Sequence, residues 1–333
     1  MKTIVFRTLG GHGIGYGHFF RSVSLAKAFL NYDNKLNVVF IINSQLMDQL
    51  IYSEIDYIIS NSFENDIEII ETLNPQLFIL DTYLAKNDYL IKVKKISKLM
   101  IFDDNNDLYD STIPDIVLNG NIHAGELQYK TNNNSLYLLG PKYLVMKEEY
   151  WKRSKYENEK YEHKNGILIT TGGTDPFNIS FHILNSIRQL PYMKRIVIGP
   201  GYEQDLIYNL EQIKDEKTEL IHKPVSLCDY IRESIVVITA GGSTIYEVLS
   251  QRTMPIIFSI ADNQDIACKY FLTLGISYIG KHPQIEYNDL NKEIIHLMDQ
   301  PNCYNDAIFD LVDGRGAKRV IEVIHPLIVK SNS

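Results

Sequence analysis

A histidine and an arginine one helical turn apart follow a glycine-rich stretch near the N-terminus. The stretch begins at Leu9 and contains five glycines before His18 and Arg21. Apolar residues precede it (3–8) and an amphipathic run follows it, so we expect a strand, a turn and a helix. A helix N-terminus favours the neutral imidazole, the form that accepts a proton. We therefore predict that His18 is a general base, with Arg21 on the same helix face.

Two familiar glycine motifs do not fit this stretch. A dinucleotide fingerprint needs a third glycine, where the chain has His18, and an acidic residue about 20 positions later, where the second strand ends in Asn43 and Ser44. A phosphate-binding P-loop needs a Gly-Lys-Ser/Thr sequence, which is absent. The alternative of a glycine-rich turn with a purely structural histidine stays open.

The pattern that surrounds this stretch alternates short apolar runs with helical periodicity. It predicts two parallel-sheet domains, that is, an α/β protein with two Rossmann-like domains facing across a cleft. The charged, tyrosine-rich stretch 148–166 is interpreted as the connection, with an N-terminal domain over 1–150 and a C-terminal domain over 164–305. Predicted strands are 3–8, 36–42, 55–59, 77–81, 98–103 and 115–119 in the first half, and 166–171, 195–198, 218–221, 235–239 and 254–260 in the second.

Two further glycine turns follow predicted strands in the second half. Gly172-Gly173-Thr174 follows the first of them, and Gly241-Gly242-Ser243-Thr244 opens a helix that contains Glu247. Parallel sheets bind ligands at the carboxyl ends of their strands, so both turns are expected on a ligand-facing edge.

Composition limits the class of protein. The 333 residues are 45% hydrophobic and carry a net charge of −8, which argues against a nucleic-acid partner. The N-terminus enters a strand directly and no apolar run is long enough to span a membrane, so we expect a cytoplasmic protein without stable membrane insertion. The three cysteines are widely spaced and indicate neither disulfides nor a zinc site.

Taken together, the motifs resemble a known family. They are the Arg7 and Ile14–Arg21 stretch, Asp81-Thr82-Tyr83, Phe102-Asp103-Asp104, Gly172–Asp175, Ala240–Thr244 with Glu247, and Ala261-Asp262-Asn263-Gln264. In this order they resemble the UDP-2,4-diacetamido-2,4,6-trideoxy-β-L-altropyranose hydrolases of pseudaminic acid biosynthesis and their spore-coat polysaccharide relatives, which share the GT-B glycosyltransferase fold. At one position the chain differs, since it has Leu9 where those hydrolases carry an acidic residue.

The resemblance implies hydrolysis of a UDP-sugar with inversion, without a metal or a cofactor, and a C-terminal helix (306–326) that packs back on the first domain. It implies that His18 is the base and that Tyr83 holds water or sugar, although a core tyrosine is equally compatible with the sequence. Adjacent carboxylates point apart on an extended segment, which argues against a metal pair at Asp103 and Asp104. We found no motif partner for Asp81.

The remaining implied roles concern binding. Substrate-binding residues would be Gly15, Gly17, Arg21, Asn263 and Gln264, and UDP-binding residues would be Gly172, Gly173, Thr174, Gly241, Gly242, Ser243, Thr244 and Glu247. A glycosyltransferase that uses a UDP-sugar donor and a non-catalytic sugar-nucleotide-binding protein are the alternatives. The sugar and the oligomeric state stay open.

Overall fold

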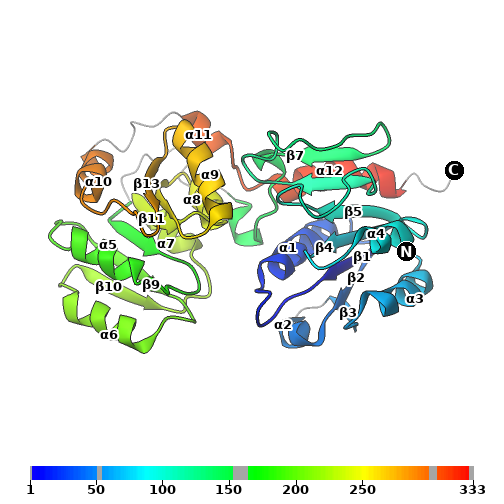
Figure 1. The fold of residues 1–333 in the computed structure, drawn as a ribbon, viewed down its shortest axis with the longest axis horizontal. Helices are drawn as coiled ribbons and strands as arrows, with labels where there is room; N and C mark the ends of the chain where they lie inside the picture. The colour runs from blue at the N-terminus through cyan, green and yellow to red at the C-terminus, as the bar shows by residue number, and fades with distance from the viewer. Residues whose placement is uncertain (1, 51–54, 153–163, 300–305, 330–333) are drawn as a thin grey trace. The chain divides into compact units, whose positions relative to one another are not determined.

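The chain folds into two compact units (Figure 1). The structure, a computed structural model, describes residues 2–50, 55–152, 164–299 and 306–329. Unit 1 comprises Met1–Trp151 and Gly314–Ser333, and unit 2 comprises Lys152–Asp313. Most of the predicted connection (153–163) and the end of the predicted second domain (300–305) lie outside the described residues.

The described part of unit 1 contains a seven-stranded parallel sheet in the order β3-β2-β1-β4-β5-β6-β7. Its strands are β1 (Lys2–Thr8), β2 (Leu36–Ile42), β3 (Asp56–Ile59), β4 (Leu77–Asp81), β5 (Lys98–Phe102), β6 (Ile116–Asn119) and β7 (Leu136–Leu139). Its α-helices are α1 (Gly17–Tyr32), α2 (Met47–Leu50), α3 (Phe63–Leu73), α4 (Asn87–Lys94) and α12 (Gly316–Val329), with 3₁₀ turns η1 (Ser44–Leu46), η2 (Pro141–Tyr143) and η3 (Glu148–Tyr150).

The described part of unit 2 repeats this topology with six parallel strands in the order β10-β9-β8-β11-β12-β13. Its strands are β8 (Ile167–Thr170), β9 (Lys194–Ile198), β10 (Thr218–His222), β11 (Val236–Ala240), β12 (Met254–Ser259) and β13 (Ser277–Lys281). Its helices are α5 (Ile179–Ile187), α6 (Gln204–Ile213), α7 (Cys228–Glu233), α8 (Thr244–Ser250), α9 (Asp262–Thr273), α10 (Leu290–Asp299) and α11 (Asp306–Asp310). The predicted class, two Rossmann-like α/β domains, is confirmed.

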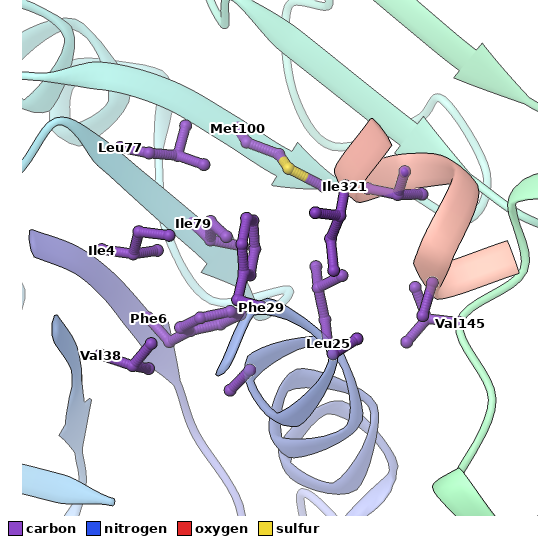
Figure 2. Packing of buried hydrophobic residues seen from close by; sticks show 14 of the residues in the cluster. Ile4, Phe6, Leu25, Phe29, Val38, Leu77, Ile79, Met100, Val145 and Ile321 are labelled. Atoms are coloured by element: carbon purple, nitrogen blue, oxygen red, sulfur yellow. The ribbon is translucent and has the colours of Figure 1, made fainter. Parts of the chain in front are cut away.

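Helix α12 closes the core of unit 1 although it comes from the other end of the chain. Figure 2 shows Ile321 of α12 beside Leu25 of α1, over the sheet face that presents Phe6. Phe6 stacks on Phe40 with ring centroids 4.9 Å apart. These side chains are fully buried, and their packing fixes α1 and α12 on the same face of the sheet.

The last helix ends later than the pattern predicts. The predicted helix 306–326 is divided into α11 and α12, and α12 continues through Pro326 to Val329. Pro326 is exposed, Ile328 is fully buried, and the Lys2 ammonium donates to the carbonyls of Ile328 (2.7 Å) and Val329 (2.5 Å). Proline costs the helix a backbone hydrogen bond. The burial of Ile328 and the Lys2 ammonium at the terminal carbonyls offset this loss of helix stability. No helix among the residues with a described structure is long and apolar enough to cross a membrane.

A buried ion pair joins β1 to α3 on the opposite face of the sheet. Arg7 Nε donates to Asp66 Oδ2 at 2.7 Å, and both side chains are almost completely buried. The Tyr89 hydroxyl donates to the same carboxylate oxygen at 3.0 Å, and Arg7 also donates to the carbonyl of Ser60. Arg7, the first of the motif residues, is therefore held inside the fold.

We expect Asp66→Ala to destabilise unit 1 strongly, because it leaves the Arg7 charge buried without its partner. Such a change typically costs about 3–5 kcal/mol. Trp151 is the single tryptophan and lies in unit 1, so urea unfolding followed by its fluorescence reports this unit. Asp289→Ala, which removes an exposed pair with Lys292, is the control, and an equal shift in both variants would contradict the prediction.

Candidate functional site

Both units place their predicted site residues at the point where the strand order reverses. In unit 1 the order reverses between β1 and β4, and in unit 2 between β8 and β11. The carboxyl ends of such strand pairs form the ligand-binding crevice of open α/β sheets. His18 follows β1 and Tyr83 follows β4, while Gly172 follows β8 and Gly241 follows β11.

His18 forms a close pair with Asp81, the last residue of β4. The distance from His18 Nδ1 to Asp81 Oδ1 is 2.6 Å, and the Asp81 side chain is 1% exposed. A carboxylate oxygen this close to Nδ1 requires a proton on that nitrogen, so Nδ1–H donates and the neutral ring has its acceptor at Nε2. Arg21 Nη2, 3.1 Å from the same Nδ1, is then a neighbour and not a donor to it.

Arg21 links this pair to a second carboxylate. Its Nε and Nη2 donate to Asp81 at 2.8 and 2.7 Å, and its Nη1 and Nη2 donate to Asp104 at 2.9 and 3.0 Å. The guanidinium also lies over the Phe102 ring at 4.6 Å. The cation therefore bridges the ends of β4 and β5 and holds both carboxylates beside His18.

Both carboxylates stay ionised. Burial alone would raise the pKa of the Asp81 carboxyl, but the Arg21 guanidinium and hydrogen bonds from Arg21 and His18 hold it below its ordinary value. The same balance holds the pKa of Asp104 well below its usual range, with a further hydrogen bond from Tyr83. An ionised Asp81 fixes the tautomer of His18 and orients its ring, as the carboxylate of a hydrolase triad does.

The glycine loop closes on itself before the helix begins. Gly11 and Gly15 exchange backbone hydrogen bonds of 3.1 and 2.9 Å, and Gly15 has φ of +82°, which favours glycine. The Gly15 N–H is thus used inside the loop. Gly17 is the first residue of α1, and a Cβ there would meet open space. The loop therefore places the start of α1, with His18, at the edge of the sheet.

In unit 2 the first glycine turn is exposed and braced from one side. Gly172, with φ of +103°, Gly173 and Thr174 are exposed. Gly201 N–H donates to the Gly173 carbonyl at 2.9 Å, and a Cβ on Gly199 would lie 2.5 Å from the same oxygen. These two glycines after β9 allow the close approach, a role that the sequence pattern did not reveal.

The second turn of unit 2 packs against α9 and begins α8. A Cβ on Gly241 would lie 2.4 Å from Cys268 Sγ, so only glycine fits there. Gly242 is half-buried, Ser243 is exposed, Thr244 begins α8, and half-buried Glu247 lies in the first turn. The Gly242 N–H donates to the Ala240 carbonyl at 2.8 Å, and the N–H groups of Ile245 and Tyr246 donate to the carbonyls of Gly242 and Ser243 at 3.3 and 3.1 Å. An anion at this helix start would therefore be bound by the N–H groups of Ser243 and Thr244.

The two predicted polar residues of the next loop lie in the first turn of α9. Asn263 is the second residue of that helix and Gln264 the third. Gln264 Oε1 accepts a hydrogen bond from the Ile260 N–H at 3.0 Å, so that oxygen braces its own loop.

The sequence pattern placed Asp81 and Asp104 at strand ends but did not show their role. Asp103 accepts from the N–H groups of Asn105 and Asn106, whereas Asp104 faces Arg21, so the adjacent carboxylates point apart as predicted. Over the described residues, no group of three or more His, Cys, Asp or Glu side chains is arranged to hold a metal. The available signal was position, because Asp81 ends β4 and Asp104 follows the end of the neighbouring strand β5 by two residues.

These features define the fold class: two Rossmann-type domains, as in the GT-B glycosyltransferases. Solved structures with this fold include Acinetobacter baumannii MurG (TM-score 0.66, 14% identity, 98% of this chain and 99% of that one). They also include the spinosyn forosaminyltransferase SpnP (0.68, 11%, covering 99% and 100%) and the UDP-GlcNAc 2-epimerase of Neisseria meningitidis bound to UDP-GlcNAc (0.66, 13%, covering 98% and 100%).

Related sequences narrow the class further, although no family model matches the chain. The UDP-2,4-diacetamido-2,4,6-trideoxy-β-L-altropyranose hydrolase of Campylobacter jejuni is 26% identical over 252 residues, 74% of this chain and 87% of that protein. The spore coat polysaccharide biosynthesis protein SpsG of Bacillus subtilis is 21% identical over 331 residues, 96% of each. Homologues of the chain thus include both kinds of protein that the motifs resemble.

An uncharacterised protein of Methanocaldococcus jannaschii is 29% identical over 262 residues. These are 74% of this chain and 53% of that protein, so the chain spans about half the length of this relative.

Proposed function

We propose that the protein hydrolyses a UDP-linked 2,4-diacetamido-trideoxyhexose to UDP and the free sugar, with inversion at the anomeric carbon. The observation that carries the proposal is the His18–Asp81 pair, a histidine oriented by a buried carboxylate at the switch point of unit 1. The relationship to the Campylobacter hydrolase and to SpsG supports the choice of reaction and substrate class.

In this mechanism His18 is the general base. With Nδ1–H donated to Asp81, the Nε2 lone pair accepts a proton from a water as that water attacks the anomeric carbon. The Asp81 carboxylate stabilises the imidazolium that forms. The C–O bond to UDP breaks as the new C–O bond forms, and a single displacement of this kind inverts the configuration. Retention would need a covalent nucleophile.

Unit 2 supplies the nucleotide site of the proposal. Backbone N–H groups at Gly172–Thr174 and at the start of α8 would bind the diphosphate without a metal ion. The Glu247 carboxylate, one turn into α8, would accept hydrogen bonds from the ribose hydroxyls. Asn263 and Gln264 would contact the sugar, Gly15 and Gly17 would shape its binding site, and Arg21 would act through Asp81.

We expect UDP to bind in EDTA and Glu247→Ala to weaken that binding about 10- to 100-fold, because a hydrogen bond to a charged group contributes about 1.5–3 kcal/mol. Isothermal titration calorimetry measures both. Glu216→Ala is the matched control, since Glu216 is exposed and precedes β10 at the amino end of the sheet. An unchanged affinity in Glu247→Ala would remove the ribose role.

Glycosyl transfer is the second candidate, and one observation favours it. Ile14, Tyr16 and Phe20, which flank His18 in the sequence, are about 40% exposed, and Lys147 Nζ lies 5.9 Å from the Phe20 ring. Apolar side chains beside a cation suit an acceptor with an apolar part.

Proton NMR of the reaction on a 2,4-diacetamido-trideoxy UDP-sugar distinguishes the candidates. Hydrolysis gives UDP and free sugar of inverted configuration in buffer alone. UDP release that requires an added acceptor would support the transferase, and binding without UDP release would support a non-catalytic binding protein.

A further inference from the structure

We infer that Asp104 is a positioning residue: it accepts the hydrogen bond from the single hydroxyl proton of Tyr83 and so leaves the phenolic oxygen as a hydrogen-bond acceptor beside His18. The inference rests on the proposed hydrolysis, in which Tyr83 faces the attacking water or a sugar hydroxyl. The sequence motif that contains Asp104 gave this residue no part in the reaction.

Three side chains donate hydrogen bonds to the Asp104 carboxylate. Tyr83 Oη lies 2.5 Å from Asp104 Oδ2, and Arg21 reaches both carboxylate oxygens. The Asn121 amide nitrogen donates to Oδ1 at 3.0 Å. Guanidinium and amide N–H groups cannot accept, so a carboxylate among them is ionised and the Tyr83 hydroxyl must be the donor.

This arrangement decides what Tyr83 can do. A phenol has one hydroxyl proton, and once that proton is donated in a hydrogen bond to Asp104, only the oxygen lone pairs remain for a ligand. Tyr83 is 44% exposed, and its ring centroid lies 4.3 Å from that of His18 in an edge-on contact. The two acceptors, His18 Nε2 and Tyr83 Oη, therefore belong to rings in direct contact. In the proposed hydrolysis each of them accepts one hydrogen bond from the attacking water.

Electrostatics keeps Tyr83 in this role. Partial burial and the Asp104 carboxylate raise the pKa of the Tyr83 hydroxyl, with a smaller opposing effect from Arg21 and a further rise from Asp81. The phenol thus stays protonated at neutral pH. Tyr83 neither competes as the base nor donates a proton to the leaving group.

A double-mutant cycle tests the inference on the full-length enzyme. We expect Asp104→Asn and Tyr83→Phe each to lower kcat about 3- to 10-fold with little change in KM, the range that one neutral hydrogen bond supports. If Asp104 acts through Tyr83, the double variant is no slower than the slower single variant. Multiplying effects, or an unchanged kcat in Asp104→Asn, would overturn it.

Asp103→Asn is the control, because its amide oxygen can still accept from the N–H groups of Asn105 and Asn106. It should retain kcat within a factor of two or so.

Nuclear magnetic resonance supplies a measurement that does not depend on turnover. With ¹³Cζ-labelled tyrosine, the Tyr83 signal is the one lost in Tyr83→Phe. We expect it to titrate at a lower pH in Asp104→Asn than in the wild type, since the group that raises its pKa is gone. Identical titration in an active enzyme refutes the Asp104 role, whereas a wild type that hydrolyses no UDP-sugar refutes the proposed function.

Discussion

Replacing His18 with alanine is expected to lower kcat about 10²- to 10⁴-fold while the affinity for UDP is unchanged. The reason is that the proposed base and the proposed nucleotide site belong to different units. His18 lies in unit 1, and the proposed nucleotide-binding residues lie in unit 2. Losing the base slows proton removal from water but leaves the UDP contacts intact. Single-turnover release of UDP measures the first effect, and calorimetry measures the second.

Two further variants make this result specific. His18→Gln fills the same space without a basic nitrogen, so it should be as slow as the alanine variant. His325→Ala is the control, because His325 contacts Asp33 at the opposite end of α1, with His325 Nε2 3.1 Å from Asp33 Oδ2. An active His18→Ala enzyme would place the base elsewhere. Tyr83 would not replace it, since the phenol keeps its proton and donates it in a hydrogen bond to Asp104.

The strands of both sheets were predictable because parallel strands buried on both faces are continuous apolar runs. Leu77–Asp81 and Val236–Ala240 are of this kind, with every residue buried. The two strands that the pattern missed, β7 and β13, are edge strands with half-buried residues, although the pattern did predict the edge strands β3 and β10. An edge strand is covered on fewer sides, so its composition is closer to that of a loop.

The site residues were predictable one by one, but their partners were not. Asp81 lies 63 positions from His18, and Asp104 lies 83 positions from Arg21. Only the strand order β1-β4-β5 brings these four side chains to one edge, and that order is set by packing across the whole sheet. Local periodicity carries no information about it, which is why Asp81 had no assignable partner.

The end of α12 also could not be predicted from the local sequence. A proline in a helical pattern predicts an end, because it removes a hydrogen bond and clashes with the preceding turn. Here the buried Ile328 and the Lys2 contacts to the last turn come from tertiary structure, and they extend the helix to Val329. Contacts between the two ends of the chain outweigh the local preference.

Asp81→Asn is expected to lower kcat by a similar factor, about 10²- to 10⁴-fold, although it removes no group that touches the water. An amide can donate to His18 Nδ1, which would move the ring proton to Nε2 and block the base; the same substitution in a serine-protease triad costs about 10⁴-fold. Arg21 keeps its bonds to Asp104, so no buried cation loses all of its partners. Asp115→Asn, at the amino end of β6, is the control.

Two measurements separate this effect from simple destabilisation. Nitrogen-15 NMR of the imidazole should show Nδ1–H in the wild type and Nε2–H in Asp81→Asn. The pKa of Asp81 is lowered in the folded state, so its contribution to stability is present above about pH 4, the ordinary carboxyl value, and is lost as pH falls below it. Acid unfolding of the variant should therefore depend less on pH in that range. A variant that retains the Nδ1–H tautomer and full turnover would show that Asp81 does not orient the base.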